Sequence, residues 1–193
     1  MNIIDNPKKS EWSELLKRPT QTVEDIEQTV NQVFNEVQSK GDWAIAKYTE
    51  LFDGTSLEQT EVSSEEIKDA EVAVSSELKD AIKLAKSNIE KFHAAQKTGK
   101  VSVETSSGVQ CWQEKRAIQK IGLYIPGGTA PLFSTILMLA VPASLAGCRD
   151  IILCTPPNKE GKVHPAILFT AALCGISRIY KIGGIQAIAA MTF

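Results

Sequence analysis

The fold is decided by Ile121-Gly-Leu-Tyr-Ile125, an apolar run that leads directly into the turn sequence Pro126-Gly-Gly128. Two similar runs, Ile151–Thr155 and Ile179–Ile182, begin 30 and then 28 residues further along the chain. Short apolar runs bounded by turn residues are typical of buried strands. Because each interval leaves room for a helix, the pattern predicts βαβ units and a parallel sheet.

Apolar segments of helical character fill the intervals between these runs. The two predicted crossover helices are Ser134–Leu145 and Pro165–Cys174, and Gly147 and Gly175 stand where their C-caps belong. Strands that are apolar almost throughout are typical of a sheet that is covered on both faces. The pattern therefore predicts an α/β fold whose parallel sheet has helices on both sides.

The first hundred residues have a different character. They hold 13 Lys/Arg and 19 Asp/Glu, whereas residues 101–193 hold only 8 and 4. Apolar residues recur there at three- and four-residue steps, which predicts amphipathic helices over Val23–Val37, Ala44–Phe52 and Leu78–Phe92. Alternation around Ser106-Ser-Gly108 predicts a β-hairpin near 101–114. We predict a mainly helical region over 1–120 and a sheet domain over 121–193.

Composition excludes several classes of protein. The net charge of −2 gives no basic field for nucleic acid, and the N-terminus lacks the layout of a secretion signal. No apolar run is long enough for a membrane span. The unclustered cysteines are interpreted as buried free thiols, which indicates a soluble protein of a reducing cytoplasm; they are Cys111, Cys148, Cys154 and Cys174.

Two glycine pairs follow predicted strands, at the sheet edge where ligands of parallel sheets bind. Gly127-Gly128 follows the first strand and Gly183-Gly184 the third, with Tyr124 and Gln186 beside them. Glycine permits close approach of a ligand to the backbone, and a helix N-terminus beyond it favours an anion. Neither pair matches G-x-G-x-x-G. Two interpretations stay open: tight strand-to-helix turns, or an anion or nucleotide site.

The histidines and cysteines give weaker indications of a functional site than the glycine pairs do. His93 and His164 have no second ligand at metal-binding spacing, and no cysteine belongs to a CxxC pair. The residues therefore predict no metal site built within this chain and give little support to nucleophilic catalysis. The acidic residues of the first half are interpreted as solvated helix faces. The tryptophans are interpreted as core or interface anchors; they are Trp12, Trp43 and Trp112.

The residues around the first glycine pair resemble a known family. The run Ile121–Thr135 closely resembles a segment of histidinol dehydrogenases. Further similar segments lie along the rest of the chain, at Gly41–Ala44, Phe52–Gly54, Leu137–Ala143, Ala146–Cys148 and Gly183–Ala190. The resemblance implies NAD-dependent oxidation of L-histidinol to L-histidine through an aldehyde, the last step of histidine biosynthesis. It also implies a zinc-dependent cytoplasmic homodimer with incomplete Rossmann-like domains.

By motif, Tyr124 and Gln186 match NAD contacts of that family, supported by the turns Gly127-Gly128 and Gly183-Gly184. The family's zinc ligands, a third NAD contact and a Glu-His pair are expected beyond Phe193. The resemblance thus implies an N-terminal portion with a truncated NAD-binding domain and no activity of its own. Two alternatives are a non-catalytic truncated dimerisation or nucleotide-binding module, and an enzyme for another phosphate ligand.

Overall fold

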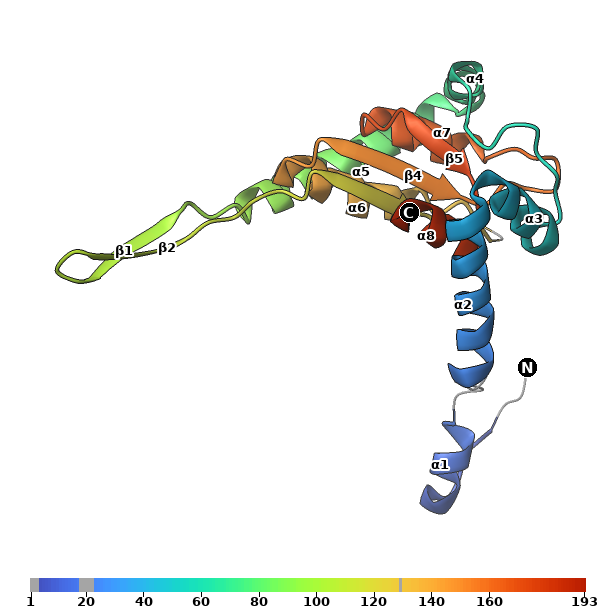
Figure 1. Cartoon of the computed structure of the whole chain (residues 1–193), viewed down its shortest axis with the longest axis horizontal. Helices are drawn as coiled ribbons and strands as arrows, with labels where there is room; N and C mark the ends of the chain where they lie inside the picture. Colours follow the sequence, from blue (N-terminus) through green and yellow to red (C-terminus); the bar gives the residue numbers. More distant parts are fainter. Residues whose placement is uncertain (1–3, 18–22, 129) are drawn as a thin grey trace. The chain divides into compact units, whose positions relative to one another are not determined.

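The computed structural model describes residues 4–17, 23–128 and 130–193 (Figure 1). Contacts divide the chain into two compact units, Met1–Gln32 and Val33–Phe193. The first unit holds a short 3-10 helix, η1 (Lys9–Glu11), the single turn α1 (Trp12–Leu15) and the beginning of α2 (Val23–Lys40). Every functional candidate lies in the second unit.

The second unit is built on the predicted parallel sheet. Its strands are β3 (Lys120–Tyr124), β4 (Asp150–Thr155) and β5 (Arg178–Lys181), in the spatial order β3-β4-β5. Helix α6 (Phe133–Ala146) joins the first two strands and α7 (Pro165–Leu173) the last two. The sequence prediction of two βαβ units is confirmed.

Helices cover both faces of this sheet, as the apolar strands predict (Figure 1). On one face, Leu123, Leu153 and Ile179 pack in one core cluster with residues of α6 and α7. On the other face, Cys154 packs with residues of α3 (Asp42–Asp53) and α8 (Gly184–Thr192). The α/β fold is thus confirmed, and α3 ends and α8 begins next to the carboxyl edge of the sheet.

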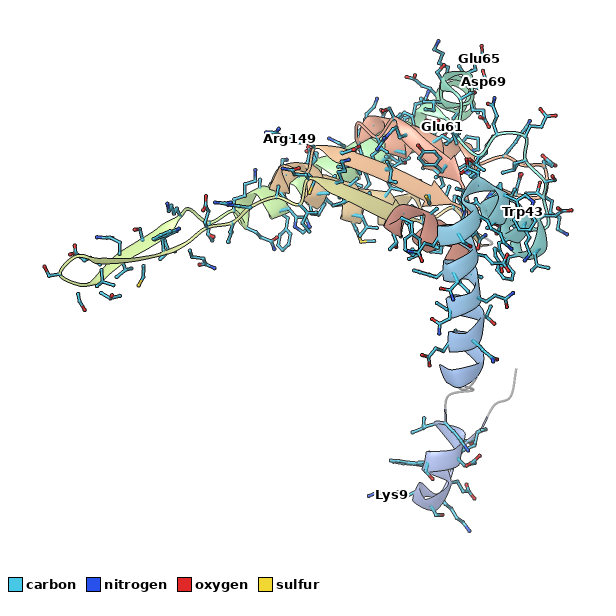
Figure 2. All side chains as sticks on the ribbon, viewed as in Figure 1. Lys9, Trp43, Glu61, Glu65, Asp69 and Arg149 are labelled. Atoms are coloured by element: carbon cyan, nitrogen blue, oxygen red, sulfur yellow. The ribbon has the colours of Figure 1, made fainter. Side chains whose placement is uncertain are left out.

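Two more helices and a hairpin complete the unit. Helix α5 (Ser76–Ala95) confirms a predicted helix, whereas α4 (Ser64–Ala73) was not predicted, because it buries only Ala70 and so shows little apolar periodicity. The predicted hairpin is formed by β1 (Val101–Ser106) and β2 (Val109–Gln113). Every residue of both strands is exposed, and their side chains extend into solvent (Figure 2).

The structure corrects some burial predictions. Trp12, Trp43 and Trp112 are 48%, 60% and 62% exposed, which excludes a core position for each, while the interpretation as interface anchors stays a prediction. Trp43, labelled in Figure 2, instead lies under the ammonium group of Lys40, 4.8 Å from its ring centroid. Among the cysteines only Cys154 is fully buried, and Cys111 is exposed because it lies on the hairpin. Within the described part of the chain, no helix is long and apolar enough to cross a membrane.

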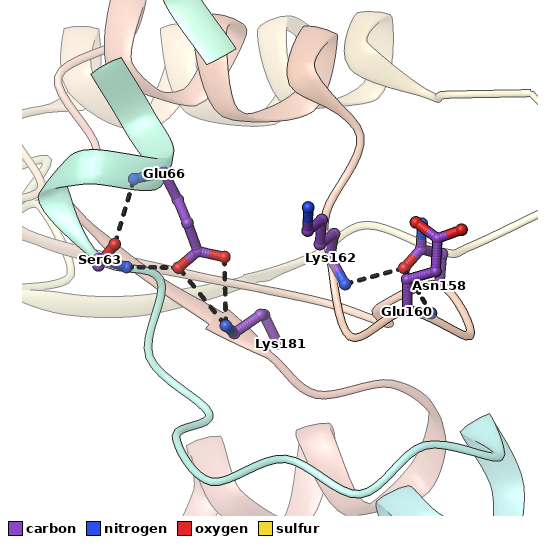
Figure 3. A network of polar contacts seen from close by, with 6 residues as sticks. All are labelled: Ser63, Glu66, Asn158, Glu160, Lys162 and Lys181. Carbon is purple, nitrogen blue, oxygen red and sulfur yellow. Dashed lines mark hydrogen bonds and ion pairs between the residues drawn. The ribbon is translucent and has the colours of Figure 1, made fainter. Parts of the chain in front are cut away.

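Helix α4 begins with a capping box and is tied to β5 by an ion pair (Figure 3). Ser63 Oγ accepts from the Glu66 N–H, and the Ser63 N–H donates to Glu66 Oε2. Lys181 Nζ, in a residue only 9% exposed, lies 3.2 Å from Glu66 Oε1. Burial acts to raise the pKa of Glu66, but the Ser63 N–H and Lys181 outweigh it, so this pKa lies below its usual value.

We expect Glu66→Gln to lower the free energy of unfolding by about 1–2 kcal/mol at pH 7, because it leaves the Lys181 ammonium without its counter-charge. Since the folded pKa of Glu66 is depressed, its contribution is present above the unfolded pKa and is lost as pH falls through the folded pKa. Urea unfolding at several pH values measures this. Glu65→Gln, an exposed neighbour, is the control, and equal losses for both variants would contradict the assignment.

Candidate functional site

The two glycine turns lie on either side of Pro156, which follows the central strand β4. A Cβ added to Gly127 would lie 2.5 Å from Pro156 Cγ, and one added to Gly183 would lie 2.7 Å from Pro156 Cβ. Both distances are shorter than a real side-chain contact. The strand order thus brings the two predicted turns together against one proline ring, and only glycine permits that approach.

A cavity of about 370 Å³ opens beside the first turn. Its walls are the Gly127-Gly128 turn, the loop after β4 and the beginning of α7. Polar side chains shape these walls: His164 Nδ1 accepts from the Ala166 N–H at 3.1 Å, and Asn158 Oδ1 accepts from the N–H groups of Glu160 and Lys162 (Figure 3). Lys162 is also one of the residues that line the cavity.

The second turn begins α8 and is bonded to the predicted tyrosine. Gly184 has the left-handed φ of 55°, and its N–H donates to the Tyr124 hydroxyl at 2.9 Å. Tyr124 ends β3, so its side chain connects the outer strand on one side to the turn that follows β5 on the other. The structure therefore brings Tyr124 together with Gly183-Gly184, which the sequence alone did not establish.

Gln186 lies in the first turn of α8 and is fully buried. Its Nε2 donates to Asp53 Oδ2 at 3.2 Å, while its Oε1 accepts no hydrogen bond from the described residues. A ligand cannot touch this side chain without some movement of the turn above it. Gln186 is thus placed at the predicted turn, but beneath it rather than on its surface.

Asp53 was missed by the sequence analysis, which interpreted the acidic residues of the first half as solvated. It ends α3, and its carboxylate accepts hydrogen bonds from the backbone N–H of Gly183 and from Gln186. Burial raises the pKa of Asp53, although these two hydrogen bonds act in the opposite direction. The available signal was the segment Phe52–Gly54, which resembles the family but carries no motif that specifies a role.

The arrangement offers groups that can bind a ligand. The N-terminal end of α8 and the close glycine backbone suit an anionic ligand, although Gly184 already donates its N–H to the Tyr124 hydroxyl. Among the described residues, no three His, Cys, Asp or Glu side chains gather to hold a metal ion. Burial raises the pKa of the Cys154 and Cys174 thiols to about 11, so neither is a thiolate near neutral pH.

The contact between Gly127 and Pro156 yields a prediction with a neighbouring control. Gly127→Ala is expected to lower the free energy of unfolding by about 1–3 kcal/mol, because the methyl group meets the rigid proline ring. Gly128→Ala meets nothing within 4 Å and is expected to change stability little. Thermal unfolding of the two variants tests this, and equal midpoints would show that the first turn can relax.

A parallel sheet covered on both faces, with paired glycine turns at its carboxyl edge, defines an α/β protein of the class that binds ligands at that edge. The sequence model of the family described as histidinol dehydrogenase matches residues 16–193. The chain therefore belongs to the histidinol dehydrogenase family, whose name implies a role in histidine biosynthesis.

Curated relatives carry the same family name. The chain is 56% identical over 193 residues to histidinol dehydrogenase of Bacteroides thetaiotaomicron, which covers 100% of this chain and 45% of that protein. It is 48% identical over 181 residues to the enzyme of Escherichia coli, covering 93% of this chain and 41% of that one. The chain thus spans less than half the length of these relatives.

A solved structure agrees with these relatives. The crystal structure of histidinol dehydrogenase from Elizabethkingia anophelis matches with a TM-score of 0.88 and 56% identity. The match covers 97% of this chain and 43% of that one. The arrangement of β3, β4 and β5 with their covering helices is therefore a family fold.

Proposed function

We propose that this chain supplies NAD-binding residues to an enzyme that oxidises L-histidinol to L-histidine through the aldehyde. The observation that carries the proposal is the pair of glycine turns packed on Pro156, with Tyr124 and Gln186 at the second turn. NAD, when bound, supplies the acceptor for the substrate's hydride. The residues of this chain bind and orient that cofactor.

Each side chain at the second turn has a hydrogen-bonding group left for a ligand. The Tyr124 hydroxyl accepts from Gly184, which leaves its own O–H free to donate to a phosphate or a sugar oxygen. Gln186 keeps an unused acceptor, Oε1. The glycine backbone at both turns allows a pyrophosphate to approach closely, and the N-terminus of α8 favours its negative charge. These features fit a dinucleotide.

The zinc of the family does not fit the residues that the structure describes, since they contain no metal-binding cluster. We therefore route no step through the metal here and derive only what the residues of this chain do. In this proposal residues 121–193 form the cofactor domain, residues 1–120 form a mainly helical region, and the working enzyme is a cytoplasmic homodimer.

The experiment is an isothermal calorimetric titration of the purified 193-residue chain with NAD. We expect saturable binding, and Tyr124→Phe is expected to weaken it about tenfold, because the ring stays and one hydrogen-bonding group is lost. Tyr180→Phe, a tyrosine of β5, is the matched control. Binding of sugar phosphates without binding of NAD would contradict the proposal and favour an enzyme for another phosphate ligand.

Catalysis is tested separately. The chain incubated with L-histidinol, NAD and zinc is expected to give no increase in absorbance from NADH, because it spans only 45% of the length of its Bacteroides thetaiotaomicron relative. NADH formation by the pure chain would contradict this expectation.

A further inference from the structure

Asp53 holds both parts of the second turn, although neither motif nor family resemblance assigned it a role. Its carboxylate accepts from Gln186 Nε2 at 3.2 Å and from the backbone N–H of Gly183. A Cβ added to Gly183 would lie 2.6 Å from Asp53 Oδ1, so the turn is pressed directly against the carboxylate. Gly54, with φ 69°, ends α3 immediately afterwards and fixes where Asp53 stands.

The chemistry of the two side chains determines how Gln186 is oriented. An ionised carboxylate only accepts hydrogen bonds, whereas an amide has a donor end and an acceptor end. Asp53 therefore requires the Nε2 end of Gln186 and leaves Oε1 on the other side. Oε1 is buried without a hydrogen-bond partner among the described residues.

The buried acceptor, Gln186 Oε1, lies close to Gly184 of the second turn. Gln186 Oε1 lies 3.0 Å from the place that a Cβ on Gly184 would occupy. Gly184 itself is exposed. At this face, therefore, the buried acceptor lies next to an exposed residue that has no side chain to shield it.

We propose that Asp53 is a positioning residue of this site, which fixes Gln186 so that Oε1 accepts a hydrogen bond from an N–H or O–H donor of the bound ligand. The identity of the ligand as NAD rests on the proposed function. NAD carries such donors on its ribose groups and on its nicotinamide carboxamide. Nicotinamide mononucleotide and AMP, titrated separately, distinguish which half of the cofactor supplies the donor.

A purely structural role accounts poorly for a carboxylate here. No described cation forms an ion pair with Asp53, and burial raises its pKa, so the folded protein carries the cost of a partly desolvated charge. Asparagine has nearly the same size and would avoid this cost. A residue that costs stability where a neutral one would fit is typical of a functional site.

The decisive variant is Asp53→Asn. Its side-chain amide can donate to Gln186 Oε1, so Gln186 is free to turn round and present its donor end instead. We expect NAD affinity to fall about tenfold. We also expect the side-chain NH₂ signals of Gln186, identified in NMR spectra by their loss in Gln186→Leu, to move. The unfolding midpoint is expected to stay the same or to rise.

Glu50→Gln is the matched control, since it removes one charge from an exposed position on the same helix. It is expected to leave affinity and the Gln186 signals unchanged. Wild-type affinity in Asp53→Asn, together with weakened binding in Gln186→Leu, would overturn this inference and leave the proposed function standing. Absence of NAD binding in the wild-type chain would instead contradict the proposed function, and this inference with it. Unmoved Gln186 signals in Asp53→Asn would overturn the positioning role whatever the affinity.

Discussion

Gly183→Ala will lower the free energy of unfolding by about 3 kcal/mol, the largest stability effect that we expect from a single methyl group in this chain. The added Cβ would lie 2.6 Å from Asp53 Oδ1 and 2.7 Å from Pro156 Cβ. Neither neighbour moves easily, because one is a proline ring and the other is a hydrogen-bonded carboxylate. The φ of Gly183 is −101°, which alanine adopts freely, so the loss is steric and not conformational.

Urea unfolding measures this effect, with Gly99→Ala as the control. A Cβ at Gly99 meets nothing within 4 Å, and the φ of Gly99 lies outside the left-handed region. The double variant Gly183→Ala with Asp53→Ala is expected to recover part of the loss, because it removes one of the two colliding groups. Equal midpoints for Gly183→Ala and Gly99→Ala would show that the second turn is not closely packed.

Gln186→Leu is expected to raise the dissociation constant for NAD about thirtyfold, or about 2 kcal/mol, the largest binding effect among the variants considered. Leucine fills nearly the same buried volume but removes the acceptor Oε1 and the donor to Asp53. The free energy of unfolding is expected to change by less than about 1 kcal/mol, since the variant also removes an unsatisfied buried oxygen.

Calorimetric titration of NAD against wild type, Gln186→Leu and Gln38→Leu checks this prediction. Gln38 is exposed on α2, so its variant controls for the loss of a glutamine amide elsewhere. Unchanged NAD affinity in a well-folded Gln186→Leu would remove Gln186 from the cofactor site. A fall in affinity that accompanies a large loss of stability would show that Gln186 acts through the fold instead.

Much of the fold could be predicted because local patterns report it directly. Near-continuous apolar runs give the strands, and turn glycines mark their ends, so β3, β4 and β5 each lie within one residue of the expected position. Helix α4 escaped prediction because it buries only Ala70 and so shows little apolar periodicity, while Glu66 pairs with Lys181, 115 residues away. No periodicity in the sequence contains that information.

The candidate site could be predicted only in part, because some of its contacts join residues that are far apart in the sequence. Glycine pairs and the adjacent Tyr124 and Gln186 are visible as local motifs. The carboxylate that holds Gln186 comes from Asp53, 133 residues earlier, and it sits among other acids that are indeed solvated. The role of Pro156 is likewise set by strand order, because only the sheet brings both glycine turns to it.

The charge division along the chain has a structural counterpart. The segment with few charges forms the sheet and the apolar helices α6 and α7. The acid-rich segment forms helices α2 to α5. Glu65 and Asp69 of α4 lie near Glu61, which precedes that helix (Figure 2). Asp53 is the exception that matters, since it turns from this acidic surface toward the carboxyl edge of the sheet.

The most direct test of the account is to record the backbone amide NMR spectrum of the ¹⁵N-labelled chain while NAD is added. We predict that the amide signals of Gly127, Gly128, Gly183 and Gly184 move together and saturate, because the two turns meet at Pro156 and form one binding edge. Saturable shifts confined to residues far from both turns, or no shifts at millimolar NAD, would contradict the claim that this edge binds the cofactor.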